Sequence, residues 1–390
     1  MMNMRSKIYL DYAATTPVDS RVLQAMLPFF DQVFGNPSSI HGYGQQAEAA
    51  LEQARQSVAE GLHCLPEEVI FTSCGSESDN LALRGAALAA RRARQANHIL
   101  ISPVEHHAVS RTAHQLADTF GFTVEYLRVD KDGMVHPDEV AKKIRKDTAI
   151  VSVIHANNEI GTINPISEIG AICRQAGVPF HTDSVQGAAH LEIDVQALNV
   201  DLLSIGAHKF YGPKGVGALY VRQGTPIIPV QTGGGQEFGL RAGTHNIPLI
   251  VGLAEAFRLA QTERQNRANR LLPLRDRLIG QILEEIPQAR LTGHPTQRLP
   301  NHASFVFHSV DGNSLLMLLD LEGFACSSGS ACKTGNPEPS EVLTALGLTP
   351  DWALGSLRVT VGMRTEPGDI EAFLEVLPEV VRKARELYRK

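Results

Sequence analysis

Short runs of apolar, mostly β-branched residues alternate with helical patterns between about residues 66 and 222. The runs are VIFT, HILIS, TVEYLRV, TAIVSVI, VPFHTD, VDLLSIG and GALYV. Buried strands separated by helices predict an α/β layer around a mostly parallel sheet, because parallel neighbours need long crossover connections. Ligands of such sheets bind at the loops beyond the strand ends. We therefore expect the functional site at these loops.

The rest of the chain predicts a second, smaller domain. Residues 252–286 read as a long amphipathic helical stretch with a kink or break at Pro273. After it, SFVFHSV and LRVTVG predict strands, NSLLMLLDLEG and PSEVLTALG predict helices, and a closing helix begins near residue 368. A chain of 390 residues, 43% hydrophobic, is long enough for two packed domains. We expect a large domain over residues 16–258 and a small domain formed by residues 1–15 and 259–390.

Composition excludes several classes of protein. A net charge of -6 with both signs interspersed gives no basic field for nucleic acid. We find no apolar run of membrane-spanning length, and MMNMRSKIYLDYAATTP lacks the features of a signal peptide, so we expect a cytoplasmic location and no membrane partner. The 5 cysteines are odd in number and include no C-x-x-C pair, which indicates neither a disulfide framework nor a zinc site.

Two of the predicted strands end in residues that suit one cofactor. VPFHTDSVQG carries Asp183, and VDLLSIGAHKFYGPKG carries Lys209. A lysine amine forms a Schiff base with the aldehyde of pyridoxal phosphate (PLP), and a carboxylate keeps the pyridine nitrogen protonated so that the ring accepts electrons. A solvated loop lysine and a turn-forming aspartate are the alternative interpretation. The pair indicates carbanion chemistry on an amino acid.

Other strand ends add candidate side chains. Gly75 and Ser76 open a helical pattern after VIFT, where backbone N–H groups favour a phosphate, although Ser76 is also an ordinary helix cap. His106 follows HILIS, where an imidazole is placed to stack on a flat ring and exchange protons, unless it is structural. Asn157 and Asn158 end VSVIHANN, and their amides suit a substrate carboxylate, a ring oxygen or a plain turn.

Two residues of the second domain also carry chemical groups. Cys332 lies in ACSSGSACKTGNPEPS, whose small residues suit a mobile segment and whose polar character argues against a buried structural cysteine. Lys333 next to it favours the thiolate. Arg358 in GSLRVTVG offers a guanidinium fork for an amino-acid carboxylate, or for a plain ion pair.

These segments together resemble the cysteine desulfurases of the NifS/IscS type. The matching stretches are YLDYAATTPVD, FGNPSSIHGYG, FTSCGSESDNLALRG, EHHAV, ANNEIGTINPI, HTDSVQ, AHKFYGPKGVGALYV, GGGQEFGLRAGT and SSGSAC, in family order from about residue 8 to 362. The resemblance implies a class-V aminotransferase with the aspartate-aminotransferase-like PLP fold (fold type I), which has a large domain and a smaller α+β C-terminal domain.

The resemblance also implies a role for each matching residue. Lys209 would bind the PLP aldehyde, Asp183 would pair with the pyridinium, and His106 would stack on the ring and shuttle protons. Cys332 would be the nucleophile that receives sulfur. The implied cofactor site consists of Gly75, Ser76, His106, Asn157, Asp183, Gln186, Gly206, His208, Lys209 and Thr244, and the implied substrate contacts are Asn157 and Arg358, with no metal.

By the same resemblance, the enzyme converts L-cysteine to L-alanine and passes a Cys332 persulfide to an acceptor or scaffold protein, for iron-sulfur cluster or thio-cofactor synthesis. Thr244 would reach the phosphate of a neighbouring subunit, which implies a homodimer with composite sites. The alternatives are a selenocysteine lyase, a cystine C-S lyase or an aminotransferase of the same fold. A PLP-binding assembly partner with little turnover is a further one.

Some positions depart from the family pattern. Gly206 stands where a serine hydroxyl usually meets the phosphate, which predicts weaker cofactor binding, whereas Ser76 replaces threonine and keeps its hydroxyl. Phe238 replaces an arginine and His245 a glutamate. Cys326 replaces an aliphatic residue, and it is either a small buried hydrophobe or a redox partner of the nucleophilic cysteine.

Overall fold

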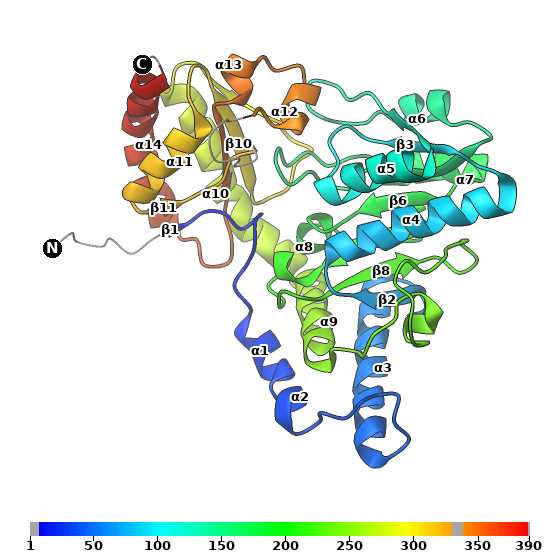
Figure 1. Cartoon of the computed structure of the whole chain (residues 1–390). Coiled ribbons are helices and arrows are strands. Elements are labelled where there is room, and N and C mark those ends of the chain that lie inside the picture. Colours follow the sequence, from blue (N-terminus) through cyan, green and yellow to red (C-terminus); the bar gives the residue numbers. More distant parts are fainter. Residues whose placement is uncertain (1–7, 330–337, 389–390) are drawn as a thin grey trace.

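The computed structural model, which describes residues 8–329 and 338–388, has a seven-stranded sheet at its centre (Figure 1). The strand order is β2-β8-β7-β6-β5-β3-β4. Neighbours from β7 to β4 are parallel, whereas β8 is antiparallel to both β7 and β2, so the predicted mostly parallel sheet is confirmed. The strands are β2 (Val69–Thr72), β3 (His98–Ile101), β4 (Thr123–Tyr126), β5 (Thr148–Ser152), β6 (Phe180–Asp183), β7 (Leu202–Gly206) and β8 (Gly217–Val221).

Helices cover both faces of this sheet. α4 (Gly75–Arg94) and α5 (His107–Phe120) pack on one face. The other face is covered by α3 (Gly42–Leu62), α6 (Pro137–Lys143), α7 (Ile166–Ala176), α8 (Gly187–His190) and α9 (Ile247–Thr262). Every residue of β2, β3 and β5 to β8 is therefore buried, which explains why these strands read as continuous apolar runs rather than alternating ones.

A second hydrophobic core lies beside the sheet domain (Figure 1). It is built on the antiparallel strands β12 (Ser356–Thr360), β10 (His302–Phe307) and β9 (Ala289–Leu291), with β1 (Ile8–Tyr9) and β11 (Phe324–Ala325) as a separate parallel pair. Its helices are α10 (Arg264–Glu285), α11 (Gly312–Leu321) and α14 (Pro367–Tyr388). The division at residues 15/16 and 258/259 remains a proposal; Leu259 and Ala260, which follow the second boundary, pack in the core of the sheet domain.

The remaining helices are short. They are α1 (Ser20–Met26), α2 (Pro28–Asp31), α12 (Glu341–Ala345) and α13 (Pro350–Ala353). Across residues 8–329 and 338–388, none of the helices combines the length and the apolar character needed to span a bilayer.

The break in the long C-terminal helical stretch differs from the prediction. α9 ends at Thr262 and α10 starts at Arg264, whereas Pro273 lies inside α10. Glu263 separates the helices because its backbone is not helical (φ -96°, ψ 1°), and its carboxylate binds Arg21 and Arg267. Packing of the apolar face of α10 against the second core outweighs the hydrogen bond that Pro273 removes.

Candidate active site

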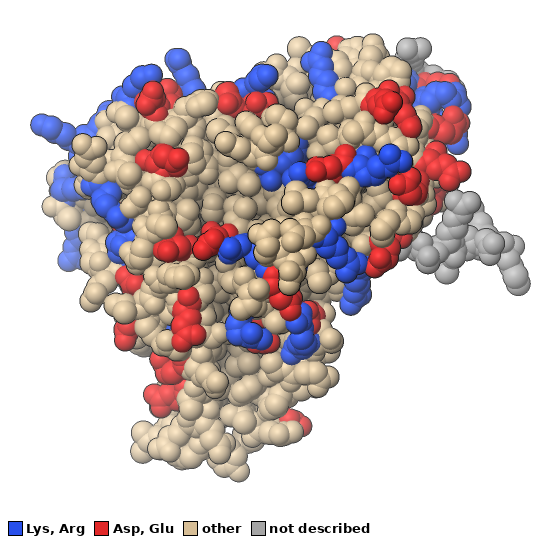
Figure 2. Space-filling model, turned by 180° about the vertical axis from the view of Figure 1, so that it is seen from behind, with Lys and Arg blue, Asp and Glu red and all other residues tan. Residues whose placement is uncertain are grey.

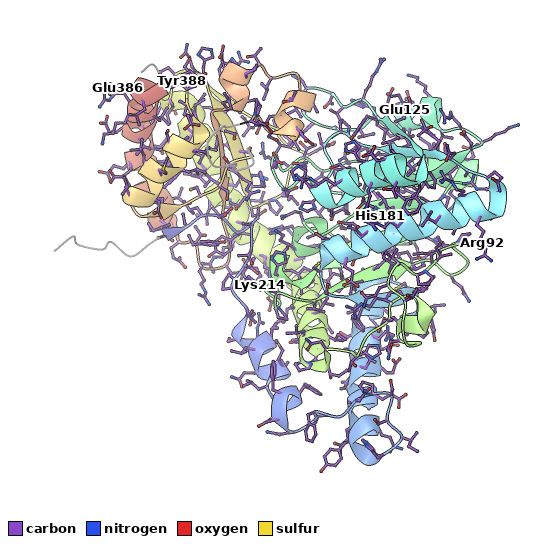
Figure 3. The ribbon with its side chains drawn as sticks, viewed as in Figure 1. Arg92, Glu125, His181, Lys214, Glu386 and Tyr388 are labelled. Carbon is purple, nitrogen blue, oxygen red and sulfur yellow. The ribbon has the colours of Figure 1, made fainter. Side chains whose placement is uncertain are left out.

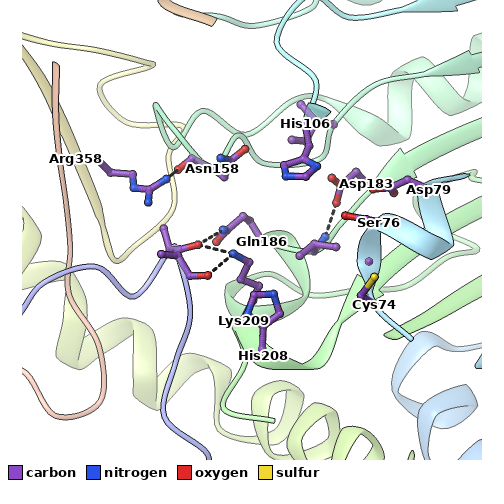
Figure 4. A pocket seen from close by; sticks show the side chains of 15 residues that line it. Cys74, Ser76, Asp79, His106, Asn158, Asp183, Gln186, His208, Lys209 and Arg358 are labelled. Carbon is purple, nitrogen blue, oxygen red and sulfur yellow. Dashed lines mark hydrogen bonds between the residues drawn. The ribbon is translucent and has the colours of Figure 1, made fainter. Parts of the chain in front are cut away.

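A pocket of about 350 Å³ lies between the two cores, beyond the carboxyl ends of β5, β6 and β7 (Figure 4). It is within the size range of small-molecule sites. Its lining consists of Ala13, Ala14, Cys74, Gly75, Ser76, Asp79, His106, Ile154, Asn158, Asp183, Val185, Gln186, His208, Lys209 and Arg358. The fold therefore brings together nine of the residues selected from the sequence, namely Gly75, Ser76, His106, Asn158, Asp183, Gln186, His208, Lys209 and Arg358.

Lys209 stands on the short helical turn Ala207–Lys209 that follows β7. Its Nζ donates hydrogen bonds to the carbonyl oxygens of Ala13 at 2.8 Å and Ala14 at 2.7 Å (Figure 4). Burial and, to a smaller extent, the nearby charge of Arg358 lower the pKa of Lys209 from 10.5 to about 8, while Asp183 and Asp11 oppose the shift. A substantial fraction of this amine is therefore neutral near physiological pH, which is the form that attacks an aldehyde.

Asp183 ends β6 and lies among other titratable groups. Its Oδ1 accepts a hydrogen bond from the Val185 N–H at 2.9 Å. Polar atoms of Asp183, Asp79 and His106 all lie within 4.8 Å of one another. Burial raises the pKa of the Asp183 carboxyl, the second carboxylate raises it further, and His106 opposes the shift. A cationic ring nitrogen would relieve this cost, so Asp183 fits a pyridinium partner.

The Asp79 carboxylate has no hydrogen-bond partner at Oδ1 within the described parts of the chain, although that atom is buried. It lies 3.5 Å from Nε2 of His181, a residue of β6 labelled in Figure 3. Burial raises the pKa of Asp79 to about 7 and lowers that of His181 to about 4. A protonated Asp79 beside an ionised Asp183 is the arrangement that minimises repulsion between the two carboxyls.

The first turn of α4 forms one end of the pocket. Cys74 precedes the helix in an extended conformation and gives it no side-chain cap, so the first N–H groups are open to an anion. A Cβ on Gly75 would lie 2.5 Å from Cγ2 of Val185, so the close approach of helix and loop requires glycine. Ser76 belongs to this turn, and His208 lines the same pocket. The turn fits a phosphate group.

The substitution Gly206→Ser is expected to strengthen the binding of PLP. A Cβ at Gly206 would lie 3.4 Å from the Gly75 nitrogen and 3.5 Å from Cγ1 of Val185, which are ordinary contacts, and the backbone there is extended. The added hydroxyl would therefore face the phosphate turn. A charge-assisted hydrogen bond of ~1.5–3 kcal/mol corresponds to a PLP dissociation constant about 10- to 100-fold lower. Equilibrium dialysis measures it, and Gly206→Ala, which fills the same space without a hydroxyl, should show no gain.

His106 caps α5 and presents its ring to the pocket. Its Nδ1 accepts a hydrogen bond from the Ala108 N–H at 3.1 Å, so in the neutral ring the hydrogen is on Nε2. Burial lowers the pKa of His106, Asp183 raises it, and Lys209 lowers it. Behind it, the buried carboxyl of Glu105 accepts from the Ser102 hydroxyl at 2.7 Å and the Ile154 N–H at 2.6 Å, which fixes the turn that carries His106.

Arg358 reaches the pocket from β12 of the second core. Its Nη1 donates to the Asn158 carbonyl oxygen and its Nη2 pairs with Oδ1 of Asp11, both at 2.9 Å. Asn157 lies outside the lining and is buried. Its Nδ2 donates to the Val104 carbonyl oxygen at 2.8 Å, and its Oδ1 accepts two backbone N–H bonds. A contact of Asn157 with the cofactor or the substrate thus remains a prediction. The second hydrogen on its Nδ2 is the one that would make this contact.

Two other residues of interest, Thr244 and Cys326, are not part of the pocket lining, and a third lies outside the described residues. Thr244 is exposed and does not contribute to the pocket of its own chain. Cys332 lies outside the described residues. Burial raises the pKa of the Cys326 thiol above its usual value, which suits a small packed residue rather than a nucleophile. A disulfide between these two cysteines remains a hypothesis.

Some pocket residues escape sequence reasoning. Asp79 follows Ser76 by three positions on a helix and therefore shares its face, a spacing that would have indicated it. Ala13 and Ala14 act through backbone carbonyls, for which the sequence holds no signal. These two residues belong to the N-terminal part of the chain, and their carbonyl oxygens accept hydrogen bonds from Lys209.

A lysine and a buried carboxylate at adjacent strand ends, with a helix N-terminus for a phosphate, define a PLP-dependent enzyme of fold type I. The sequence model for the family described as Aminotransferase class-V matches residues 8–373. A relative from Dictyoglomus turgidum named cysteine desulfurase IscS is 47% identical, over 98% of this chain and 96% of the relative. One of the same name from Methanosarcina thermophila is 49% identical, over 97% and 93%.

Solved structures agree with these relatives. A NifS-like protein superimposes with a TM-score of 0.89 at 36% identity, covering 97% of this chain and 100% of that one. A structure described as SspA in complex with cysteine gives a TM-score of 0.79 at 36% identity, covering 92% and 99%. The chain belongs to the class-V aminotransferase family, among the cysteine desulfurases of the NifS/IscS type. Its cofactor is pyridoxal 5'-phosphate.

Proposed function

We propose that the protein is a cysteine desulfurase that converts L-cysteine to L-alanine and transfers the sulfur through a persulfide on Cys332. The observation that carries this proposal is the convergence of Lys209, Asp183 and Arg358 on one pocket. These three groups suit the aldehyde, the ring nitrogen and the substrate carboxylate. The cysteine bound to the related SspA supports the choice of substrate.

Each residue has a defined task in this reaction. PLP supplies an electron-accepting ring next to Cα of the bound amino acid. Lys209 holds the cofactor and, once free, takes the Cα proton, while Asp183 keeps the ring nitrogen protonated and Arg358 orients the carboxylate. His106 exchanges protons with the thiol groups. The Cys332 thiolate attacks the substrate sulfur, the electrons of the C–S bond remain on carbon, and protonation there completes alanine.

A nucleophilic cysteine separates this proposal from its alternatives. An aminotransferase of the same fold needs no such thiol and requires a keto-acid acceptor. A selenocysteine lyase or a cystine C-S lyase would share the pocket but prefer another substrate. An assembly partner with little turnover would have no need of the complete set of Lys209, His106 and Cys332.

A homodimer with composite sites belongs to the same proposal. α1, α2 and the start of α3 project from the sheet domain (Figure 1). The tip of this projection is mostly free of charged side chains in Figure 2 and exposes Phe30, Phe34, Ile40 and Tyr43, of which Ile40 is 94% exposed. A second copy would cover these apolar side chains. The exposed Thr244 would then be available to the phosphate of the partner's site.

The proposal also covers the sulfur acceptor and the location of the protein in the cell. The persulfide would pass to an acceptor or scaffold protein for iron-sulfur cluster or thio-cofactor synthesis, as the names of the relatives suggest. Cys64, Cys74, Cys173 and Cys326 are free thiols in the structure. Free cysteines and a reactive thiol suit a reducing compartment, which supports a cytoplasmic location.

Persulfide formation is the direct test. After exposure of the PLP-loaded protein to L-cysteine without reductant, we expect a mass increase of one sulfur, mapped by peptide analysis to Cys332. Cys332→Ala should lose the added sulfur and retain less than about 1% of alanine formation, because it removes the nucleophile itself. Cys326→Ser, a matched change in the same FACSSGSAC stretch, should keep both. Retained sulfur in Cys332→Ala would contradict the proposal.

A further inference from the structure

Asp11 connects Arg358, the arginine proposed to bind the substrate carboxylate, to a second polar residue, Ser327. Its Oδ1 pairs with Nη2 of Arg358 at 2.9 Å, and its Oδ2 accepts a hydrogen bond from the Ser327 hydroxyl at 2.7 Å. Ser327 and Arg358 also exchange backbone hydrogen bonds at 3.3 and 2.7 Å. The Asp11 side chain is 14% exposed and that of Arg358 is 8% exposed. The pair is therefore largely withdrawn from water, where charge pairing is strong.

The main chain places Asp11 without help from its side chain. The Thr360 N–H donates to the Leu10 carbonyl oxygen at 2.8 Å, and the Ala13 N–H donates to the Thr360 hydroxyl at 2.9 Å. The same segment accepts the Lys209 amine through the carbonyls of Ala13 and Ala14. A change of charge at Asp11 should therefore leave its backbone in place.

Arg358 remains available to a ligand while it is paired. It lines the pocket, and its Nη1 is fixed by the Asn158 carbonyl oxygen (Figure 4). Its Nη1 and Nη2 each carry a second hydrogen that a ligand can accept, whereas its Nε is buried and has no hydrogen-bond partner in the described parts of the chain. A guanidinium with one carboxylate already bound and donors still open attracts a second carboxylate, but less strongly than an unpaired one.

We propose that Asp11 is a positioning residue that holds Arg358 at the pocket before substrate binds and then competes with the substrate carboxylate for the same guanidinium. Asp11 thereby sets how weakly the amino-acid carboxylate is held. This inference rests on the proposed function, in which Arg358 binds the carboxylate of L-cysteine. Weak holding suits an enzyme that must release alanine, which carries the same carboxylate as its substrate.

A carboxylate that lacks an amine tests the inference without turnover. 3-Mercaptopropionate keeps the thiol and carboxylate of cysteine and has no amine to react with the cofactor, and 3-mercaptopropionamide is its uncharged counterpart. The PLP-loaded parent, Asp11→Asn and Asp11→Glu would be titrated with both compounds under reductant, with thermal unfolding as the readout. Asp276→Asn, which alters the carboxylate paired with Arg275 at 2.6 Å on α10, is the matched control.

We expect Asp11→Asn to bind 3-mercaptopropionate about 3- to 10-fold more tightly than the parent, because one negative charge beside Arg358 is gone. Without ligand, its unfolding temperature should fall, since a buried guanidinium has lost its counter-ion, and the carboxylate should restore it. Binding of the amide should not change. Asp11→Glu and Asp276→Asn should bind like the parent.

Other outcomes would overturn the inference. Equal or weaker binding of the carboxylate to Asp11→Asn would mean that Asp11 is only structural. A parent that binds acid and amide equally would remove Arg358 from the carboxylate site, and with it the inference, whereas persulfide formation on Cys332 would still decide the desulfurase function. If Asp11→Asn does not fold, Asp11→Ser, which is also uncharged but smaller, must show the same tightening.

Discussion

Replacing Lys209 with alanine is expected to reduce alanine formation from L-cysteine by about 10⁴-fold or more, because the residue both holds the cofactor and moves the Cα proton. Its amine is the group that meets Ala13 and Ala14 at 2.8 and 2.7 Å across the pocket. The variant should also lose the visible absorption of covalently bound PLP. Steady-state kinetics and an absorption spectrum of the dialysed protein measure the two effects.

The same residue predicts a pH dependence. Only the neutral amine attacks the aldehyde, and burial brings the pKa of Lys209 from 10.5 down to about 8. The rate of covalent PLP incorporation into the apoprotein should therefore rise with pH and level off above pH 8, rather than continue to rise towards pH 10.5.

A matched change nearby controls for general damage. Lys214→Ala alters an exposed lysine in the same AHKFYGPKG stretch, labelled in Figure 3, which is not one of the residues that line the pocket. This variant should keep its chromophore and its activity within about twofold, as expected for a surface substitution. Covalent PLP in Lys209→Ala, released only by denaturation, would show that another amine holds the cofactor.

The sheet was predictable because its strands are buried on both faces. Runs such as TAIVS and LLSIG consist mostly of apolar or small side chains on both faces of the strand, which is a local signal. The positions of Asp183 and Lys209 followed from the rule that parallel strands place their carboxyl ends at one edge. The phosphate turn at Gly75 was visible for the same reason, as a strand end followed by a helix start.

Contacts between distant segments were not predictable in this way. Asp11 meets Arg358 across nearly the whole sequence, and no periodicity links the two. The helix break at Glu263, whose carboxylate pairs with Arg21 of α1, has no local signal, whereas Pro273, which is a local signal for a break, lies inside α10. The burial of Asp79 Oδ1, which has no hydrogen-bond partner among the residues that the structure describes, is likewise a property of tertiary packing, because any aspartate near a helix start resembles a solvated cap.

Asp183→Asn should reduce turnover by about 10³- to 10⁴-fold, comparable to the loss when a carboxylate that tunes a catalytic ring nitrogen becomes an amide. The amide keeps an oxygen for the Val185 N–H, which donates to Oδ1 at 2.9 Å in the parent, so the loop should hold its shape. It has no charge, however, to keep the pyridine nitrogen protonated. Covalent binding of PLP through Lys209 should persist, which separates this variant from Lys209→Ala.

The structure supplies a control for this carboxylate as well. Asp201 lies at the opposite end of the neighbouring strand, where its Oδ2 accepts a hydrogen bond from the Phe180 N–H at 2.9 Å. Asp201→Asn should leave turnover nearly unchanged, because ligands bind only at the carboxyl ends of these strands. Replacing PLP with an analogue whose ring nitrogen is permanently alkylated should restore part of the activity of Asp183→Asn, since the positive charge is then fixed. Full activity of Asp183→Asn with PLP itself would show that ring protonation does not depend on this carboxylate.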